Sequence, residues 1–72
     1  MPESVYKVIE LVGSSSESWE KAAAAATKQA AKTLRDIRIA EVVMLDATLA
    51  KDGTIESYRA KLRISFKYAG QG

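Results

Sequence analysis

The chain has 72 residues, of which 47% are apolar and 28% are charged, and it contains neither cysteine nor histidine. A domain of this size buries only about 60% of its unfolded surface, so small folds commonly add disulfides, a structural metal or self-association. Disulfides and a zinc-finger site are excluded, because the residues that form them are missing. We therefore expect one small domain that acts as a subunit of a homo-oligomer.

Charge and hydropathy exclude further classes of protein. The net charge of +2 lacks the large basic excess of a nucleic-acid-binding protein. No apolar stretch approaches the ~20 residues of a transmembrane helix, and the first residues lack the basic and apolar segments of a signal peptide. Together with the absence of cysteine, these features predict a cytoplasmic protein without a membrane partner, and a small basic nucleic-acid binder is only the third interpretation.

The first predicted element is a strand over residues 4–12, which are rich in β-branched and aromatic side chains and end at Gly13. Both of its faces are apolar: Val5, Ile9 and Leu11 occupy one, and Tyr6, Val8 and Val12 occupy the other. A strand of this kind is typical of burial between two layers, so we expect it to be covered on both sides.

A helix is predicted next, over about residues 16–35. Ser14 and Glu17 have the spacing of a capping box, and Ser16 is an equally good N-cap. The alanine run 22–26 favours helix and allows a close approach to a sheet. Apolar residues recur at steps of three and four and define one packed face: Trp19, Ala22, Ala23, Ala26, Ala30, Thr33, Leu34 and Ile37.

Two segments with period two, 39–50 and 55–68, flank Asp52-Gly53, which predicts a hairpin with a two-residue loop. Opposite residue numbers then sum to 105, and a one-residue slip would mix the apolar and polar faces. The apolar face pairs Val43 with Leu62, Leu45 with Ala60, Ala47 with Tyr58 and Ile39 with Phe66; the other pairs Asp46 with Arg59, Met44 with Lys61 and Val42 with Arg63.

These elements make residues 1–72 a single α+β domain with an ordered core over about 4–68. The element order is β-α-β-β, and a three-stranded antiparallel sheet packs its apolar face on one helix.

Several segments resemble the dodecins, small proteins that assemble as hollow homododecamers. The resemblance lies in the opening strand 5–15, the helix start 18–22, the pair Glu41-Val42 and the strand 58–66, in this order and spacing. It covers about residues 4–68. It implies that this chain has the dodecin fold and that twelve copies of the chain assemble into a homododecamer. It also implies a non-enzymatic shell that binds, stores or sequesters a small-molecule ligand, namely flavin as riboflavin or FMN.

The resemblance also places a cofactor site. In flavin-binding dodecins a tryptophan early in the second strand stacks on the flavin, and a glutamine in the third strand bonds its polar edge. The matching positions here are Ile39 and Arg59, and Glu41 completes the implied set. Ile39 has no π face, and Arg59 donates but cannot accept a hydrogen bond. The alternative is therefore a shell whose flavin binding is weak or lost. Such a shell would bind metal ions or have a structural role.

Calcium or magnesium is the second implied cofactor. The stretch from Asp36 to Ala40 resembles the corresponding sequence in a branch of the dodecins that is linked to calcium. Asp46 is the first candidate ligand and Glu41 the second. Calcium requires six to eight oxygens, and the sequence has no EF-hand loop, so such a site would have to form on a symmetry axis. The other interpretation of Asp46 is a cross-strand pair with Arg59.

The remaining candidates favour binding over catalysis. Arg59, Lys61, Arg63 and Lys67 form a basic row that either attracts a phosphate or pairs with Glu10, Glu41 and Asp46. Trp19 lies on the helix stripe and is predicted to pack in the core or at a subunit contact. With no histidine, cysteine, phosphate loop or nucleophile elbow, we predict no enzyme.

Overall fold

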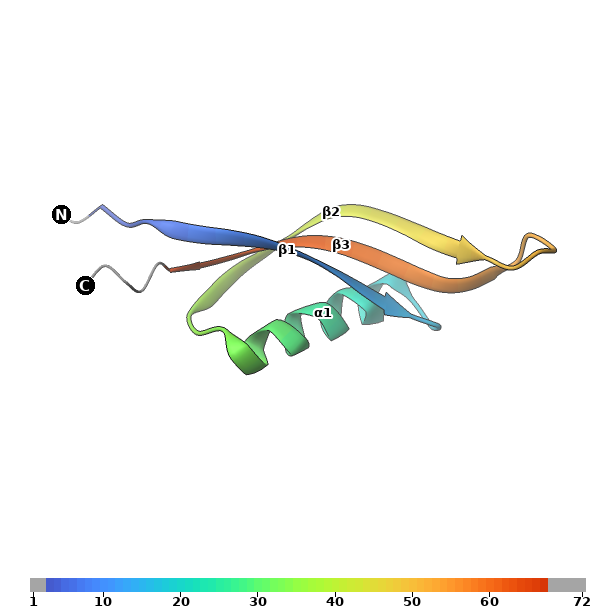
Figure 1. Cartoon of the computed structure of the whole chain (residues 1–72), viewed down its shortest axis with the longest axis horizontal. Helices are drawn as coiled ribbons and strands as arrows, with labels where there is room; N and C mark the ends of the chain where they lie inside the picture. Colours follow the sequence, from blue (N-terminus) through green and yellow to red (C-terminus); the bar gives the residue numbers. More distant parts are fainter. Residues whose placement is uncertain (1–2, 68–72) are drawn as a thin grey trace.

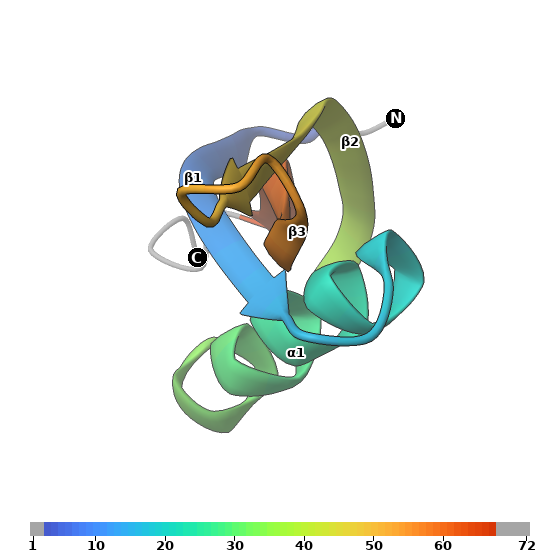
Figure 2. The same cartoon turned by 90° about the vertical axis from the view of Figure 1, so that its right-hand side faces the viewer.

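The computed structural model describes residues 3–67. It contains strand β1 (Tyr6–Ser15), helix α1 (Trp19–Thr33), strand β2 (Ile37–Leu49) and strand β3 (Ile55–Lys67). The strands form one antiparallel sheet in the order β1-β3-β2, and α1 lies across one face, mainly against β1 and β3 (Figures 1 and 2). The predicted β-α-β-β fold, with a three-stranded sheet on one helix, is confirmed.

The core lies between α1 and the middle strand. The buried side chains are small or aliphatic: Ala22, Ala26 and Ala30 from the helix, and Ala60, Leu62 and Ile64 from β3. Three alanines at four-residue steps give the helix a smooth face. That smooth face allows α1 to lie close to the sheet, as the alanine run predicts.

Gly13 does not end β1, which continues to Ser15. A Cβ on Gly13 would collide with the carbonyl oxygen of Ala22 and lie 3.0 Å from the Cβ of Ala26. Glycine is therefore needed inside the strand, because the helix backbone passes directly over it. The prediction that this glycine is a strand terminator was wrong for that reason.

The helix is shorter than predicted and begins after a different cap. The Ser18 hydroxyl accepts the backbone N–H of Lys21 at 3.0 Å, so Ser18 is the N-cap rather than Ser14 or Ser16. Ser14 still belongs to β1. The strand thus occupies residues that the capping pattern assigned to the helix start, and the helix spans 19–33 instead of 16–35.

The hairpin turn has three residues, 51–53, rather than two. The N–H of Gly53 donates to the carbonyl of Ala50 at 2.9 Å, and the N–H of Ala50 donates to the carbonyl of Thr54 at 2.8 Å. Gly53 has a φ of 90°, the left-handed conformation that such a loop requires. Asp52 steadies the turn by accepting the Thr54 N–H and hydroxyl at 3.1 and 2.8 Å.

The predicted register is confirmed in the middle of the hairpin and wrong near the start of β2. Residues 44–47 face residues 58–61 as expected. Irregularities between Val42 and Met44, and between Ile37 and Ile39, then each add a residue to β2. The corrected pairs are Val42 with Leu62 instead of Arg63, Glu41 with Arg63, and Ile39 with Ser65 instead of Phe66, and Val43 has no partner in the register.

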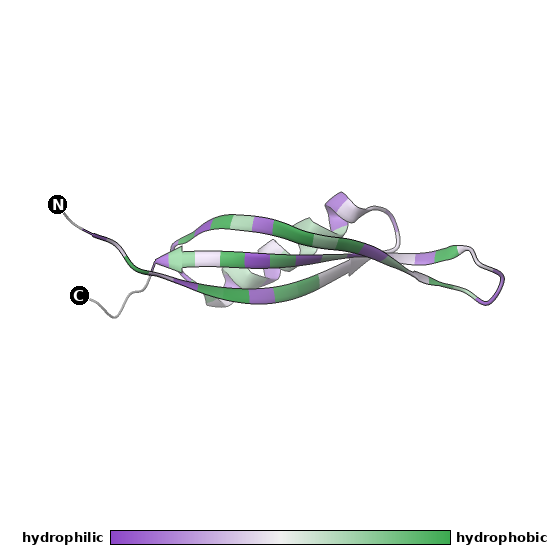
Figure 3. Cartoon of the chain, turned by 90° about the horizontal axis from the view of Figure 1, so that it is seen from above, coloured by the Kyte–Doolittle hydropathy of each residue, from purple (hydrophilic) through white to green (hydrophobic). Residues whose placement is uncertain are grey.

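Within one chain β1 is covered on one side only, so the expected second layer has to come from other copies of the chain. Ile9 and Leu11 pack towards the core, whereas Val8 and Val12 on the other face are each 55% exposed. Within the described residues, α1 covers one face of the sheet, so the chain supplies no second layer. Hydrophobic residues lie along all three strands (Figure 3).

Candidate functional site

The candidate site is the sheet face turned away from α1, here called the far face. Ala60, Leu62 and Ile64 of β3 are buried under the helix, so the alternate side chains of β3 point away from it. Directly paired residues share a face, which gives four rows across the three strands. These rows are Val8–Ser65–Ile39, Glu10–Arg63–Glu41, Val12–Lys61–Met44 and Ser14–Arg59–Asp46.

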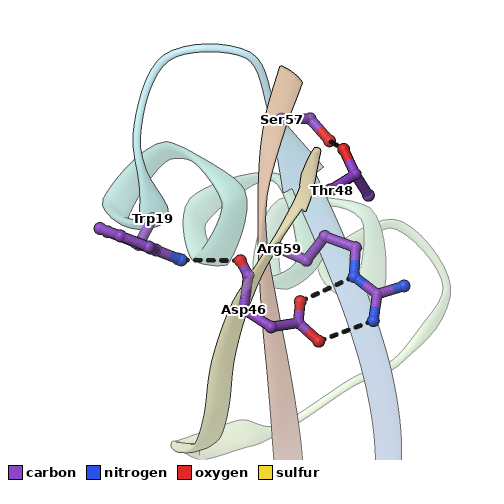
Figure 4. A network of polar contacts seen from close by, with 5 residues as sticks. All are labelled: Trp19, Asp46, Thr48, Ser57 and Arg59. Atoms are coloured by element: carbon purple, nitrogen blue, oxygen red, sulfur yellow. Dashed lines mark hydrogen bonds and ion pairs between the residues drawn. The ribbon is translucent and has the colours of Figure 1, made fainter. Parts of the chain in front are cut away.

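One end of the far face carries a bidentate ion pair. The Arg59 Nε–H donates to Asp46 Oδ1, and the Arg59 Nη2 donates to Asp46 Oδ2, each at 2.7 Å (Figure 4). The hydrogen bonds from Arg59 and its charge lower the pKa of the Asp46 carboxyl, and the same contacts raise the pKa of Arg59. The predicted cross-strand pair between these residues is confirmed.

A second charged cluster surrounds Glu10. Its carboxylate accepts the Arg63 Nε–H at 3.0 Å and lies 3.6 Å from the Lys61 Nζ. The Arg63 hydrogen bond, followed by the charge of Lys61, lowers the pKa of Glu10. Glu41 faces Arg63 from the other side and helps to raise the pKa of that guanidinium. Three residues of the basic row, Arg59, Lys61 and Arg63, are therefore paired with Asp46 or Glu10, in line with the second interpretation of that row.

The three predicted cofactor residues all lie on the far face, but one chain does not bring them together. Ile39 is 59% exposed and stands in the row of Ser65, with Glu41 in the next row. Arg59 lies six residues away from Ser65 along β3, about 20 Å at the usual rise of a strand. A ligand that touches both Ile39 and Arg59 therefore needs side chains from two subunits.

The two predicted metal ligands share the far face of β2, with Met44 between them. Both carboxylate oxygens of Asp46 already accept hydrogen bonds from Arg59. Between residues 3 and 67, no three acidic, histidine or cysteine side chains come close enough together to hold a metal ion. A metal at Asp46 or Glu41 would thus need ligands from other subunits.

Trp19 makes a contact that the sequence interpretation missed. Its indole Nε1–H donates to the backbone carbonyl of Asp46 at 2.9 Å, and its ring meets Tyr58 edge-on, with centroids 4.7 Å apart. The side chain is 38% exposed. The only available signal was indirect: this is the single tryptophan of the chain, directly after the helix cap.

A shallow apolar groove of about 240 Å³ runs between β1 and α1. Its lining is small and aliphatic apart from one amide: Leu11, Val12, Gly13, Ala25, Ala26 and Gln29. These residues offer contact to an apolar side chain and no charged group. In the part of the chain that the structure describes, no helix is long and apolar enough to cross a membrane.

Solved structures with the same βαββ architecture define the class of this protein. The structure superposes on a crystal structure of a dodecin mutant from Thermus thermophilus with a TM-score of 0.84 at 38% identity, covering 92% of this chain and 97% of the other. For calcium dodecin of Mycobacterium tuberculosis, a calcium-chelating antigen, the TM-score is 0.81 at 45% identity, covering 96% and 97%.

Sequence comparisons agree with the structural ones. The family model Dodecin matches residues 5–69, and the chain belongs to the dodecin family. It is 48% identical over 64 residues to calcium dodecin of M. tuberculosis, covering 89% of each chain. It is 40% identical over 63 residues to dodecin of T. thermophilus, covering 88% of this chain and 90% of the other. The dodecamer is the known assembly of this family.

Proposed function

We propose that this protein forms a hollow homododecameric shell that binds and stores small ligands without converting them. One observation carries the proposal: the edge strand β2 is apolar and exposed on both of its faces. Val42 and Leu45 on the helix side are each 51% exposed, and Ile39 and Met44 on the far face are 59% and 52% exposed. Such a strand is a liability unless other copies of the chain cover it.

Native mass spectrometry tests the assembly. We expect a complex of about 94 kDa at micromolar concentration, which is twelve times the 7.8 kDa chain. A stable folded monomer at that concentration would contradict the proposal.

The ligand that the family favours is a flavin held between subunits. Ile39 occupies the position that matches the flavin-stacking tryptophan of other dodecins, and it offers an apolar contact there. Glu41 lies next to Ile39 on the far face. Arg59 would come from a neighbouring subunit. Its pair with Asp46 uses two of five N–H donors, so three can still bond a flavin carbonyl or a phosphate.

Fluorescence titration with riboflavin and FMN tests this site. We expect quenching of the flavin emission, and we expect Ile39→Trp to strengthen binding because it supplies the missing π face. Thr48→Trp is the matched control, since it adds an indole elsewhere on β2. No quenching at tens of micromolar protein, or equal effects of the two indoles, would count against the flavin site.

Calcium is a second candidate because of the 48% identity to a calcium dodecin. The proposed ligands are Asp46 and Glu41, repeated by the symmetry of the shell. Binding to the folded state alone stabilises it by about 2.7 kcal/mol at a hundredfold excess over Kd. We therefore expect calcium to raise Tm above the value in chelator, and Asp46→Asn with Glu41→Gln to abolish that increase. An unchanged Tm would contradict calcium binding, and magnesium serves as the comparison ion.

A further inference from the structure

Asp46 is held from two sides by residues of two other elements. Its backbone carbonyl accepts the indole N–H of Trp19 at 2.9 Å, and its carboxylate accepts two hydrogen bonds from Arg59 at 2.7 Å. Trp19 begins α1, whereas Arg59 lies in β3. Helix, edge strand and middle strand thus meet at one residue, with Trp19 and Arg59 approaching it from opposite sides (Figure 4).

The indole that makes this link is itself fixed in place. Ser18 caps the helix immediately before Trp19, and the edge of Tyr58 meets the indole with the two ring planes 74° apart. The helix packs mainly on β1 and β3 and makes few contacts with β2. The Trp19 hydrogen bond therefore adds a direct link from the helix to the edge strand that carries Asp46.

We propose that Trp19 is a positioning residue for the ligand-contacting pair Asp46–Arg59. The indole N–H holds β2 at Asp46, the Asp46 carboxylate holds the guanidinium, and the remaining donors of Arg59 keep one orientation. A ligand that bonds to those donors then does not have to order the side chain itself. The inference rests on the proposed function, in which Arg59 contacts the ligand.

The Asp46–Arg59 ion pair is exposed, and this exposure explains why the hydrogen bond from Trp19 matters for its geometry. The side chains of Arg59 and Asp46 are 46% and 40% exposed, and an exposed ion pair gains little from holding two side chains in one geometry. Glu10 provides the comparison on the same face. It bonds to Arg63 through a single nitrogen at 3.0 Å and lies 3.6 Å from Lys61. The bidentate geometry occurs at the residue whose backbone Trp19 holds.

The first test needs no ligand. Trp19→Phe keeps a ring to pack on Tyr58 but loses the N–H. We expect ¹⁵N NMR of labelled arginine to show faster solvent exchange of the Arg59 Nε–H, because its bond to Asp46 is held less firmly. The Arg63 Nε–H, which bonds to Glu10, is expected to stay the same and serves as the internal control. An unchanged Arg59 Nε–H signal in Trp19→Phe would overturn the proposal.

The second test is a double-mutant cycle with FMN as the probe. Arg59→Gln is expected to weaken FMN binding, and Trp19→Phe alone is expected to weaken it by about threefold, as for the loss of one hydrogen bond. In the Arg59→Gln background, Trp19→Phe should have no further effect on FMN binding. An equal loss in both backgrounds would contradict positioning through Arg59.

Thr48→Val is the matched control for that cycle. It removes the Thr48–Ser57 hydroxyl contact of 2.7 Å, which lies on the same strand pair, without touching Asp46 or Arg59 (Figure 4). We expect it to leave FMN affinity unchanged. If Arg59→Gln has no effect on FMN binding, the proposed flavin site fails, whereas the NMR signal of the Arg59 Nε–H in Trp19→Phe still decides the role of Trp19.

Discussion

The two faces of the sheet differ in how far their side chains are buried and in how many of them are charged. On the helix side, Ala60, Leu62 and Ile64 are 0–1% exposed and pack against α1. The helix can lie this close to the sheet because its packed face consists of alanines. On the far face, rows of apolar and charged side chains alternate, and Val8 and Met44 are more than half exposed. The helix side of β1 and β3 therefore stabilises the fold of one chain, whereas the far face and both faces of β2 are left to contact other molecules.

The largest expected effect comes from disturbing the close approach on the helix side. Gly13→Val places side-chain atoms where the Ala22 carbonyl and Ala26 already lie. We expect a loss of at least about 3 kcal/mol in the free energy of unfolding, measured by chemical denaturation, because the helix has to move. Ser14→Val, one residue further on the exposed far face, is expected to change stability little. Similar losses from both variants would erase the proposed difference between the faces.

Met44→Glu tests the far face without touching the core. Because Met44 is 52% exposed in the single chain, we expect the fold to survive, as judged by circular dichroism. Taking a carboxylate out of water at a subunit contact is costly even with Lys61 opposite it on β3, so we expect native mass spectrometry to show loss of the dodecamer. Met44→Leu keeps an apolar side chain and should still assemble. A Met44→Glu dodecamer of normal stability would mean that this part of the far face is not an interface.

The smallest expected effect is an acid sensitivity confined to the far face. The pKa values of Asp46 and Glu10 are lowered in the folded chain from ordinary values of 3.8 and 4.5. Their ion pairs therefore stabilise the fold fully above those values, and this contribution is lost as the pH falls through the lowered pKa values. We expect Tm to fall below about pH 4.5, and the double variant Asp46→Asn/Glu10→Gln to show a flatter profile. Identical profiles would exclude these pairs as the source.

Local pattern predicted some parts of the molecule well. The alternation in residues 44–47 and 58–61 gave the correct pairing, including Asp46 with Arg59, because the side chains of a strand alternate between two faces. The same pattern failed at Val42 and Val43. Val43 is the extra residue, and because it and Val42 are both apolar, its insertion leaves no mark on the hydrophobic period. The insertion nevertheless places Glu41 rather than Val42 opposite Arg63.

The arrangement of the candidate site residues depended more strongly on contacts between segments that are distant in the sequence. The resemblance to the dodecins put Ile39, Glu41 and Arg59 in one site, whereas the register separates Ile39 from Arg59 along the far face. The bond from Trp19 to Asp46 joins residues 27 positions apart. Its acceptor is a backbone carbonyl, which every residue has, so no residue type at position 46 could have revealed it.

The sequence by itself determined the order of the elements, the apolar side of the helix and the absence of disulfides, because periodicity and composition act over short stretches of chain. Only the tertiary structure decided that Gly13 lies inside a strand under the helix, that Glu41 rather than Val42 faces Arg63, and that Trp19 reaches Asp46. These features arise from the packing of segments that are remote in sequence, and close approach and register are properties of the pair rather than of either segment.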